Sequence, residues 1–282
     1  MNERTVGPVL INGEVHDPME ASVSIFDIGF QRGYGCFEAM RVYGGTPFRL
    51  GDHLDRLDRS AKHLRIELPH MSELGAWCTA VAVQGRSVGG GVLRVYVTGG
   101  TDPKHPGTDN RIIVFLEPLP HIPASVRLDV LDAPWHADGR SSELTGAKTL
   151  SYGPNLAATI TARSRGFDDA ALVGDGDVVL EGPTFSLGWV SSGQLCTPAL
   201  DSHILASITR EATIEVAARL GVPVREERFL RSDLLAADEV FVMSTVREVL
   251  PVVAVGERTV EPGPITRALR SGFHDLVASE TE

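Results

Sequence analysis

The segment PLPHIPAS, at residues 118–125, is the feature that most limits how this chain can fold. It carries three prolines and has neither a helical nor a strand period. Proline removes a backbone donor and disfavours helix in the residue before it, so such a stretch separates folded regions. Because the chain has 282 residues, it is long enough for two domains. We therefore expect a small N-terminal domain at 1–117, an interdomain linker at 118–125 and a larger C-terminal domain at 126–282.

The N-terminal part shows the patterns of antiparallel strands and of a helix. Residues 9–15, VLINGEV, place an Asn-Gly pair between apolar residues, which is a strong hairpin signal. Residues 36–50, CFEAMRVYGGTPFRL, predict two strands joined at a Gly-Gly pair. The segment at 51–66 predicts a helix, because its apolar residues recur at helical spacing. Those residues are Leu54, Leu57, Ala61 and Leu64.

The C-terminal part also mixes strands and helices. Residues 170–182, AALVGDGDVVLEG, place an Asp-Gly turn between apolar strands, and residues 188–198, GWVSSGQLCTP, repeat the hairpin pattern. A helix is predicted to start at Ser207, with apolar residues on one face and Gly221 placed to end it. The sequence therefore predicts an α+β chain of two parts.

Composition excludes several classes of function. The net charge of −11 comes from 37 acidic and 26 basic residues, and no Lys/Arg-rich block favours a nucleic-acid partner. The three cysteines, Cys36, Cys78 and Cys196, fit neither a disulfide framework nor a zinc site, so we expect no metal. No stretch approaches the roughly 20 apolar residues that cross a bilayer, and the N-terminus lacks an apolar run of signal-peptide length. We expect a cytoplasmic protein without a membrane partner.

Two charged residues occupy unusual settings. Lys148 stands among small, apolar and hydroxyl residues in ELTGAKTLSYGPNLAA, at 143–158. A desolvated lysine has a lowered pKa, and its amine can attack a carbonyl; a lysine with its tip in solvent is the alternative. Glu181 follows three apolar residues at the end of a predicted strand. It could hold a ring nitrogen protonated, or it could be an ordinary acid at a turn.

Hydroxyl residues mark two further element ends. Residues 207–209, Ser-Ile-Thr, open the predicted helix, where free amides and the helix dipole favour an anion. A plain N-cap would have the same sequence. Ser244 and Thr245 follow the apolar run EVFVM. Arg56, at the edge of its helix's apolar face, could bind a phosphate through a forked contact or could cover the helix.

Six segments of this chain, taken in order, resemble one known family. They are DIGFQRGYGCFEAMRVYGG at 27–45, HLDRLDRSAKHL at 53–64, AKTLSYGPNLA at 147–157, VVLEGP at 178–183, ILASITREATIEVAARLGV at 204–222 and ADEVFVMSTVREVLPV at 237–252. The chain resembles the fold type IV pyridoxal-phosphate enzymes from about Ile11 to Val252. That family contains branched-chain aminotransferases, D-amino acid aminotransferases, (R)-amine transaminases and aminodeoxychorismate lyases. The resemblance implies a two-domain α+β fold like that of D-amino acid aminotransferase, with pyridoxal 5'-phosphate (PLP) bound to the C-terminal domain.

The resemblance also implies roles for single residues. Lys148 matches the lysine that holds the cofactor aldehyde covalently and moves the proton at the substrate alpha carbon. Glu181 matches the carboxylate that pairs with the pyridine nitrogen. Tyr152 is the candidate partner of the cofactor phenolate, although its spacing from Lys148 is one residue shorter than in branched-chain enzymes. Around the phosphate and ring the resemblance implies Arg56, Leu205, Ser207, Ile208, Thr209, Ser244 and Thr245. Ser186 and Ala206 depart from the asparagine and glycine that the family often has.

The candidate substrate residues depart from two branches of the family. Phe37 stands where D-amino acid aminotransferases have a carboxylate-binding tyrosine, and the loop DPKHPG, with Lys104 and His105, replaces their arginine and histidine loop. Arg32 and Ala39 stand where branched-chain enzymes carry a tyrosine and a glycine.

Arg94 is a cation on a predicted apolar strand. It lies between Leu93 and Val95 in sequence, so its side chain should point to the opposite face of the sheet. Such an arginine needs an anionic partner. That partner is either the substrate carboxylate or an acid such as Glu38.

These patterns predict a homodimeric transaminase that passes an amino group from a D-amino acid or (R)-primary amine to a 2-keto acid. Dimerisation is implied by the resemblance alone. Aminodeoxychorismate lyase, which AKTLSY and LEGP resemble, is the first alternative; Ala39 stands where that branch commonly has a threonine. A branched-chain L-amino acid aminotransferase is the second. A binding protein that carries the cofactor without turnover is an alternative of another class.

Overall fold

The computed structural model describes residues 5–136 and 142–281, and its chain divides into two compact units. Unit 1 comprises Met1–His121, Ala147–Tyr152 and Glu280–Glu282, and unit 2 comprises Ile122–Gly146 and Gly153–Ser279. The segment that contains Lys148 therefore belongs to the same unit as the N-terminal residues. The domain boundaries expected from the sequence stay a prediction.

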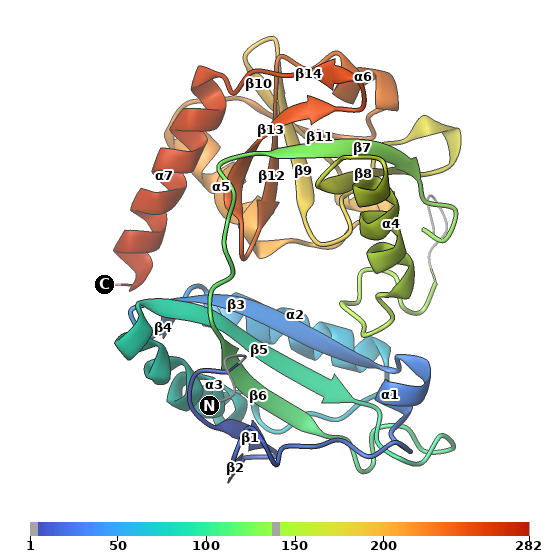
Figure 1. Ribbon diagram of the computed structural model, residues 1–282, viewed down its shortest axis with the longest axis vertical. Coiled ribbons are helices and arrows are strands. Elements are labelled where there is room, and N and C mark those ends of the chain that lie inside the picture. Colours follow the sequence, from blue (N-terminus) through green and yellow to red (C-terminus); the bar gives the residue numbers. More distant parts are fainter. Residues whose placement is uncertain (1–4, 137–141, 282) are drawn as a thin grey trace. The chain divides into compact units, whose positions relative to one another are not determined.

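Unit 1 is built on a six-stranded sheet in the order β2-β1-β6-β5-β3-β4, in which all neighbours are antiparallel (Figure 1). The strands are β1 (Val9–Ile11), β2 (Glu14–His16), β3 (Gly35–Tyr43), β4 (Thr46–Pro47), β5 (Gly90–Thr98) and β6 (Ile112–Glu117). The helices are α1 (Ile28–Arg32), α2 (Leu50–His63) and α3 (Met71–Ala82), with the 3-10 turn η1 (Val83–Val88). The predicted hairpin at Asn12-Gly13 is present, with both residues at positive φ as a two-residue hairpin turn requires.

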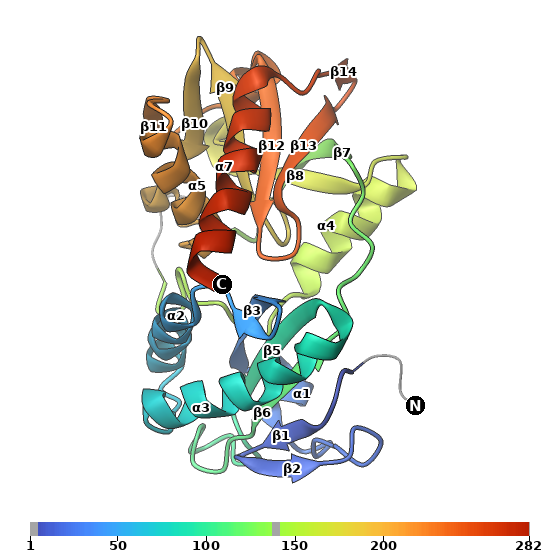
Figure 2. The same ribbon diagram turned by 90° about the vertical axis from the view of Figure 1, so that its left-hand side faces the viewer.

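Strand alternation gives the sheet of unit 1 two different faces. Helices α2 and α3 cover one face (Figure 2), and the core there includes Met40, Leu57 and Leu93. The opposite face carries three aromatic rings in a row. Phe37 stacks on Tyr96 with ring centroids 5.6 Å apart, and Tyr96 stacks on Phe115 at 5.8 Å. The alternating sequence of β3 therefore separates an apolar core from an aromatic surface.

Unit 2 is built on a mixed sheet of eight strands in the order β11-β10-β9-β12-β13-β7-β8, with β14 paired to β13. The strands are β7 (Val126–Asp132), β8 (Asp169–Val173), β9 (Ser186–Ser191), β10 (Gln194–Pro198), β11 (Val224–Glu227), β12 (Glu239–Ser244), β13 (Glu248–Val255) and β14 (Arg258–Thr259). The helices are α4 (Gly153–Ser164), α5 (Ile208–Arg219), α6 (Arg231–Leu235) and α7 (Pro264–Thr281), with 3-10 turns η2 (Asp175–Asp177) and η3 (Leu200–Ser202). Helix α4 packs on β7 and β8, and α5 packs on β11, β12 and β13.

The strand that the sequence predicts before Glu181 is not formed. Val178 and Val179 form isolated bridges rather than a strand, and Glu181 lies just beyond them. Its carbonyl still accepts a hydrogen bond from the amide of Leu172, which ties it to β8. Lys148 likewise lies in an irregular segment, where Thr149 makes one bridge to Cys36 of β3. Each segment pairs with its neighbouring strand over too few residues to form a regular ladder.

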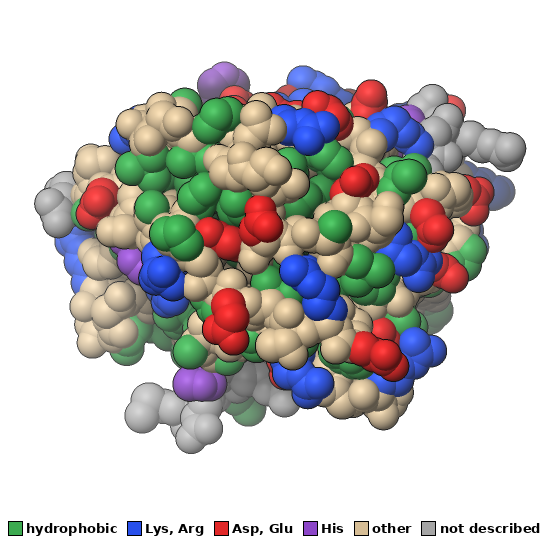
Figure 3. All heavy atoms as spheres, turned by 90° about the horizontal axis from the view of Figure 1, so that it is seen from above, with side chains coloured by type: hydrophobic (Ala, Val, Ile, Leu, Met, Phe, Trp, Pro, Cys, Tyr) green, Lys and Arg blue, Asp and Glu red, His purple; other side chains and the backbone are tan. Residues whose placement is uncertain are grey.

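One face of the molecule carries charges of both signs. On the face drawn in Figure 3, acidic and basic side chains of the described residues are interspersed.

Within residues 5–136 and 142–281, no helix is both long and apolar enough to cross a membrane. The same residues contain no group of three His, Cys, Asp or Glu side chains able to hold a metal ion.

Candidate active site

The amine of Lys148 lies among aromatic groups in unit 1. Its Nζ is 4.4 Å from the centroid of the Phe37 ring and donates a hydrogen bond to the hydroxyl of Tyr152 at 3.3 Å. Phe37 and Tyr152 contact each other edge to face, with ring centroids 5.1 Å apart. The lysine is half-buried. This setting is closer to the desolvated lysine of the sequence-based hypothesis than to a solvated surface residue.

The main chain of Lys148 is fixed from two sides. Its amide donates to the hydroxyl of Ser60 on α2 at 3.0 Å, and its carbonyl accepts from the amide of Phe37 on β3 at 3.0 Å. Both backbone groups of the lysine are thus satisfied within unit 1. The side chain therefore starts from a defined point on the sheet.

Arg56 is buried on α2, where it binds the carboxylate of Glu38 from β3. Its Nε donates to Oε1 at 2.7 Å and its Nη2 donates to Oε2 at 2.8 Å, a bidentate contact. The Nδ1 of His53 lies 2.7 Å from the same Oε2. Arg56 is therefore held as an ionic side chain in the core, rather than laid over the outside of its helix.

The charges in this cluster shift the pKa values of its members. Burial alone would raise the pKa of the Glu38 carboxyl, but the charge and hydrogen bonds of Arg56 outweigh it and hold that pKa below its usual range. Burial lowers the pKa of His53; its contact with Glu38 opposes this shift, and the charges of Arg56 and Lys148 add to it. The cluster therefore favours ionised Glu38 beside neutral His53.

In unit 2 the carboxylate of Glu181 is half-buried. The amide of Leu205 lies 3.3 Å from each of its oxygens and donates to them. The Nε2 of His136 lies 3.6 Å from Oε1. Glu181 and Leu205, which are 24 residues apart in sequence, are thus brought together. A carboxylate with one amide partner and a neighbouring imidazole can accept a further donor.

The N-terminus of α5 offers backbone donors. Ser207 is the N-cap, and its hydroxyl accepts from the amide of Arg210 at 3.3 Å. Within the described residues, the amides of Ile208 and Thr209 have no protein acceptor. Such amides at a helix start are the usual feature of an anion site.

The turn after β12 carries the second hydroxyl pair. The hydroxyl of Ser244 accepts from the amide of Arg247 at 3.2 Å, which closes the turn that holds Thr245. Arg247 in turn donates to Asp169 of β8 at 2.8 Å. The turn is therefore tied to the sheet of unit 2 by a half-buried ion pair.

The candidate substrate residues occupy different parts of unit 1. Arg94 is on the aromatic face with Phe37, directly opposite Ala39 in the neighbouring strand. Its Nε donates to Glu117 at 2.7 Å; Glu38, considered as a partner from the sequence, faces the other side of the sheet and binds Arg56.

Arg32 ends α1 and is exposed, as are Lys104 and His105. In the loop between β5 and β6, His105 pairs with Asp102. Across the described residues, no hydrogen bond or ion pair joins these three side chains to Lys148, Phe37 or Arg94. The structure thus brings Phe37 to the lysine. Arg32, Lys104 and His105 have no such contact with the lysine among the described residues.

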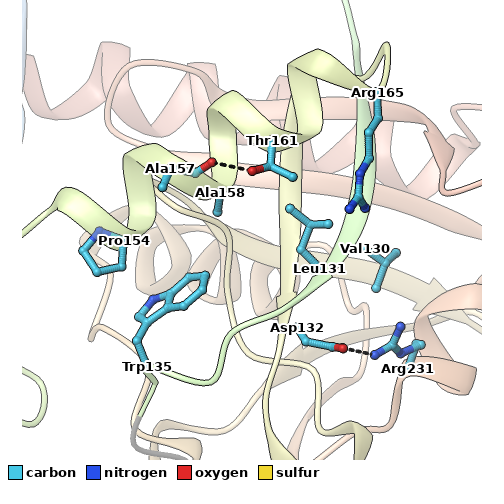
Figure 4. Close-up of a pocket in the computed structure, with 10 residues that line it drawn as sticks. All are labelled: Val130, Leu131, Asp132, Trp135, Pro154, Ala157, Ala158, Thr161, Arg165 and Arg231. Carbon is cyan, nitrogen blue, oxygen red and sulfur yellow. Dashed lines mark hydrogen bonds and ion pairs between the residues drawn. The ribbon is translucent and has the colours of Figure 1, made fainter.

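A cavity of about 500 Å³ lies in unit 2 and is distinct from these residues (Figure 4). Its lining residues are Val130, Leu131, Asp132, Trp135, Pro154, Ala157, Ala158, Thr161, Arg165 and Arg231. The charged members are paired, Arg231 with Asp132 and Arg165 with Asp129. None of the predicted site residues lines it.

Comparison with known proteins assigns the family. Residues 35–255 match the model of amino-transferase class IV. The chain belongs to the class IV aminotransferases. A Methanocaldococcus jannaschii protein with the provisional name of branched-chain-amino-acid aminotransferase is 32% identical, over 95% of this chain and 96% of the relative. The D-alanine aminotransferase of Staphylococcus aureus is 29% identical, over 97% of this chain and 99% of its own.

Solved structures agree with this assignment. The PLP-bound form of a hypothetical aminotransferase from Mycobacterium tuberculosis matches with a TM-score of 0.87 and 25% identity, over 97% of this chain and 99% of the other. The aminotransferase has the α+β fold of the type IV transaminases, as the sequence predicted. It is a PLP-dependent enzyme that acts on an amino donor and a keto acid acceptor.

The residues of this aminotransferase fit that cofactor chemically. Lys148 offers an amine beside aromatic rings, which suits an aldehyde on a flat heterocycle. Glu181 offers a half-buried carboxylate for a ring nitrogen, and the α5 amides offer donors for a phosphate. When bound, PLP supplies an electron sink for negative charge at the substrate alpha carbon. In the role that the resemblance implies, the amine of Lys148 would take and return the proton at that carbon.

Four polar residues of this aminotransferase were not singled out as site residues from the sequence. Glu38, His53 and Ser60 surround Arg56 and the main chain of Lys148, and His136 lies beside Glu181. For Glu38 a signal was present: it alternates with Phe37 and Ala39, so an acid on the core side of β3 required a buried cation. For Ser60 and His136 the contacts join residues distant in sequence, and no local pattern marks them.

Proposed function

We propose that this aminotransferase transfers the amino group of a D-amino acid or an (R)-primary amine to a 2-keto acid, with D-amino acids preferred. The proposed roles are those implied by the resemblance: Lys148 as covalent anchor and acid/base, Glu181 as partner of the ring nitrogen, and Tyr152 beside the phenolate. We propose Arg56, Thr245 and the α5 amides for the phosphate. Leu205 packs on the ring in this proposal, with Ser207 and Ser244 supporting the two phosphate-binding turns.

The proposed preference for amino acids rests on the position and the hydrogen bonding of the Arg94 side chain. Its side chain is 24% exposed and lies on the same face of the sheet as Phe37, whose ring is next to the Lys148 amine. Among the described residues its hydrogen-bond partner is Glu117, whose carboxylate accepts a hydrogen bond from Nε. The two terminal nitrogens of the guanidinium are therefore left for another acceptor, such as a carboxylate.

A branched-chain L-amino acid aminotransferase is the second candidate, because the Methanocaldococcus jannaschii relative is 32% identical to this chain. The methyl group of Ala39 speaks against it. Ala39 lies directly opposite Arg94, at the position where the branched-chain enzymes carry a glycine, and it reduces the space beside the guanidinium. Arg32, in place of their tyrosine, changes the chemistry at a second position.

A panel of amino donors in both enantiomers tests this proposal. Arg94→Ala should raise the Michaelis constant for D-alanine or D-glutamate and leave (R)-1-phenylethylamine almost unaffected, since only the carboxylated donor loses a partner. Loss of one charge-assisted contact predicts an effect on the order of tenfold to a hundredfold in kcat/KM. Arg165→Ala, which removes an exposed, ion-paired arginine of unit 2, is the control.

Three outcomes of the panel would reject the proposal. Equal slowing of both donors by Arg94→Ala would make the arginine structural. A wild-type preference for L-leucine would replace the proposal by the branched-chain function. Turnover of aminodeoxychorismate without an amino donor would replace it by the lyase.

We also propose that the enzyme is a homodimer. The support is a run of large apolar side chains that one chain leaves exposed in the N-terminal region. Met19, Ile25, Phe26 and Phe30 are between 65% and 74% exposed. Exposed apolar groups close together in sequence mark an interaction surface.

A further inference from the structure

A buried polar cluster lies behind Lys148 in unit 1. The carboxylate of Glu38 is fully buried and receives both the bidentate contact of Arg56 and the contact of His53. Around it are the apolar residues of the core that α2 and β3 share. Replacing a buried ion pair by apolar residues is often neutral or stabilising, so stability alone is a weak reason for this cluster. The cluster therefore points to a role in placing its members.

The Glu38 contact fixes how the Arg56 guanidinium is presented. Two parallel hydrogen bonds of 2.7 and 2.8 Å define both the position and the plane of the group. The buried His53 contacts the Glu38 carboxylate as well and so helps to fix its position. Without Glu38, the guanidinium would lose the partner that sets its plane.

Ser60 links the same helix to Lys148. Its hydroxyl donates to the Arg56 carbonyl at 2.9 Å and accepts from the Lys148 amide at 3.0 Å. Arg56 and Ser60 are four residues apart, so one turn of α2 carries both contacts. The serine is 1% exposed, and water cannot readily replace it. A single hydroxyl thus connects the main chain of Arg56 to the main chain of Lys148.

We propose that Glu38 and Ser60 are positioning residues that hold the phosphate-binding arginine and the covalent lysine in one register. This proposal rests on the proposed roles of Arg56 and Lys148. Glu38 acts through the guanidinium and therefore on the phosphate end of the cofactor. Ser60 acts through the Lys148 backbone and therefore on the aldehyde end. The two residues should consequently affect different parts of the same ligand.

Three probes of the apoprotein separate the two ends. PLP has both the phosphate and the aldehyde, pyridoxal lacks the phosphate, and pyridoxine 5'-phosphate lacks the aldehyde. Glu38→Gln should weaken PLP and pyridoxine 5'-phosphate by on the order of tenfold and leave pyridoxal within about twofold. Ser60→Ala should weaken PLP and pyridoxal by a similar factor and leave pyridoxine 5'-phosphate within about twofold. Dissociation constants from fluorescence or calorimetry give these ratios without any measurement of turnover.

Controls and second variants keep the test decisive. Asp129→Asn removes another buried carboxylate that pairs with an arginine, and Ser164→Ala removes a helix hydroxyl that bonds only to its own helix; both should leave all three constants unchanged. If Glu38→Gln does not fold, Glu38→Asp keeps the charge but shortens the side chain, and it should still weaken only the phosphate-bearing probes. Ser60→Thr keeps the hydroxyl and should restore the aldehyde-dependent affinity.

The reference variants Arg56→Ala and Lys148→Ala separate failure of this inference from failure of the proposed function. If Arg56→Ala weakens all three probes equally, or Lys148→Ala binds pyridoxal normally, the proposed roles themselves are wrong. If those variants behave as expected but Glu38→Gln and Ser60→Ala weaken the three probes equally, both residues are structural and the inference is overturned. Unchanged binding in both variants overturns it as well.

Discussion

An amine that lies over one aromatic ring and bonds to the hydroxyl of another is poorly placed for ordinary surface solvation. Lys148 has this setting, with Phe37 and Tyr152 as its neighbours and its main chain tied to α2 and β3. The rings reduce the contact of this amine with water and place it beside flat apolar surfaces. At the scale of the residue, the chemistry depends on what surrounds the lysine more than on the lysine alone.

Replacement of Lys148 by alanine should remove turnover while cofactor binding persists. In the proposed roles of Lys148, the variant loses both the covalent attachment and the group that transfers the proton, and acid/base catalysis alone contributes about a hundredfold to ten-thousandfold. We expect PLP to remain bound through its phosphate contacts, with an absorbance spectrum like that of the free aldehyde. Lys62→Ala, at an exposed lysine paired with Asp58, is the control. Normal turnover by Lys148→Ala would refute the assigned mechanism.

Glu181→Gln should fold and bind PLP but transaminate more slowly. An opposite charge within about 4–6 Å raises the pKa of a cationic nitrogen by about 1–3 units, so its loss reduces the protonated ring fraction by about tenfold to a thousandfold. The half-reaction with a single amino donor, followed by stopped-flow absorbance, measures this directly. Asp168→Asn, at another acid of unit 2, serves as control. An unchanged half-reaction rate would remove Glu181 from this role.

At the scale of the element, the first turn of α5 combines a cap with two amides that have no protein acceptor. Ser207→Ala should destabilise the protein by about 1 kcal/mol, because the amide of Arg210 loses its acceptor. It should also weaken PLP, since a frayed helix start presents the amides of Ile208 and Thr209 less firmly.

Urea unfolding of the apoprotein and PLP titration measure the two effects of Ser207→Ala separately. Thr161→Ala, which removes a hydroxyl that bonds only within α4, should change stability by less than about 0.5 kcal/mol. Unaltered PLP affinity in a destabilised Ser207→Ala variant would mean that the cap supports the helix only.

The contact between His53 on α2 and Glu38 on β3 should make the stability of the protein sensitive to acid. The pKa of buried His53 is lowered from 6.5 and that of Glu38 from 4.5, so both groups bind protons more readily in the unfolded chain. Their contribution to stability is present above those unfolded values and is lost as the pH falls toward the folded ones. The loss therefore begins near pH 6.5 with His53 and is joined below pH 4.5 by Glu38.

The histidine part of this prediction can be isolated by mutation. In His53→Gln, the unfolding free energy should change less steeply between pH 6.5 and 5, by up to about 1.4 kcal/mol per pH unit. Urea unfolding at several pH values gives the slope. The exposed His121, replaced by glutamine, should leave the slope as in wild type. Equal slopes in His53→Gln and wild type would show that His53 does not titrate differently on folding.

Several turns, helices and caps could be predicted from the sequence because each depends on residues that are close together in the chain. The Asn12-Gly13 hairpin, the helix that contains Leu54 and Leu57, and the N-cap at Ser207 all follow from residues close together in sequence. The contact between Ser60 and Lys148 spans 88 residues, and that between Leu205 and Glu181 spans 24. Such contacts depend on how elements pack, which spacing and composition do not determine. The resemblance supplied the candidate roles, but it gave no reason to consider Ser60.

At the scale of the whole molecule, the exposed apolar side chains between residues 19 and 30 favour an interaction surface. Isolated apolar residues are normal on a surface, but Met19, Ile25, Phe26 and Phe30 lie within twelve residues and are all more than half exposed. The net charge of −11 opposes nonspecific association between copies of the chain. The proposed homodimer would cover these groups by a specific contact between two copies of the chain.

The last prediction concerns this contact. Phe26→Asp combined with Phe30→Asp should convert a dimer into a monomer, because each aromatic ring buried at an interface adds about 1.5–3 kcal/mol and a buried carboxylate adds a desolvation cost. Light scattering coupled to size exclusion measures the mass, expected as twice 30.3 kDa for wild type and 30.3 kDa for the variant. Leu119→Asp, which places the same charge at an exposed leucine outside residues 19–30, should stay dimeric. If the dimer completes the site, the monomeric variant also loses transaminase activity while keeping its secondary structure by circular dichroism. A wild-type mass of one chain, or a double variant that stays dimeric, would show that residues 19–30 do not form the interface.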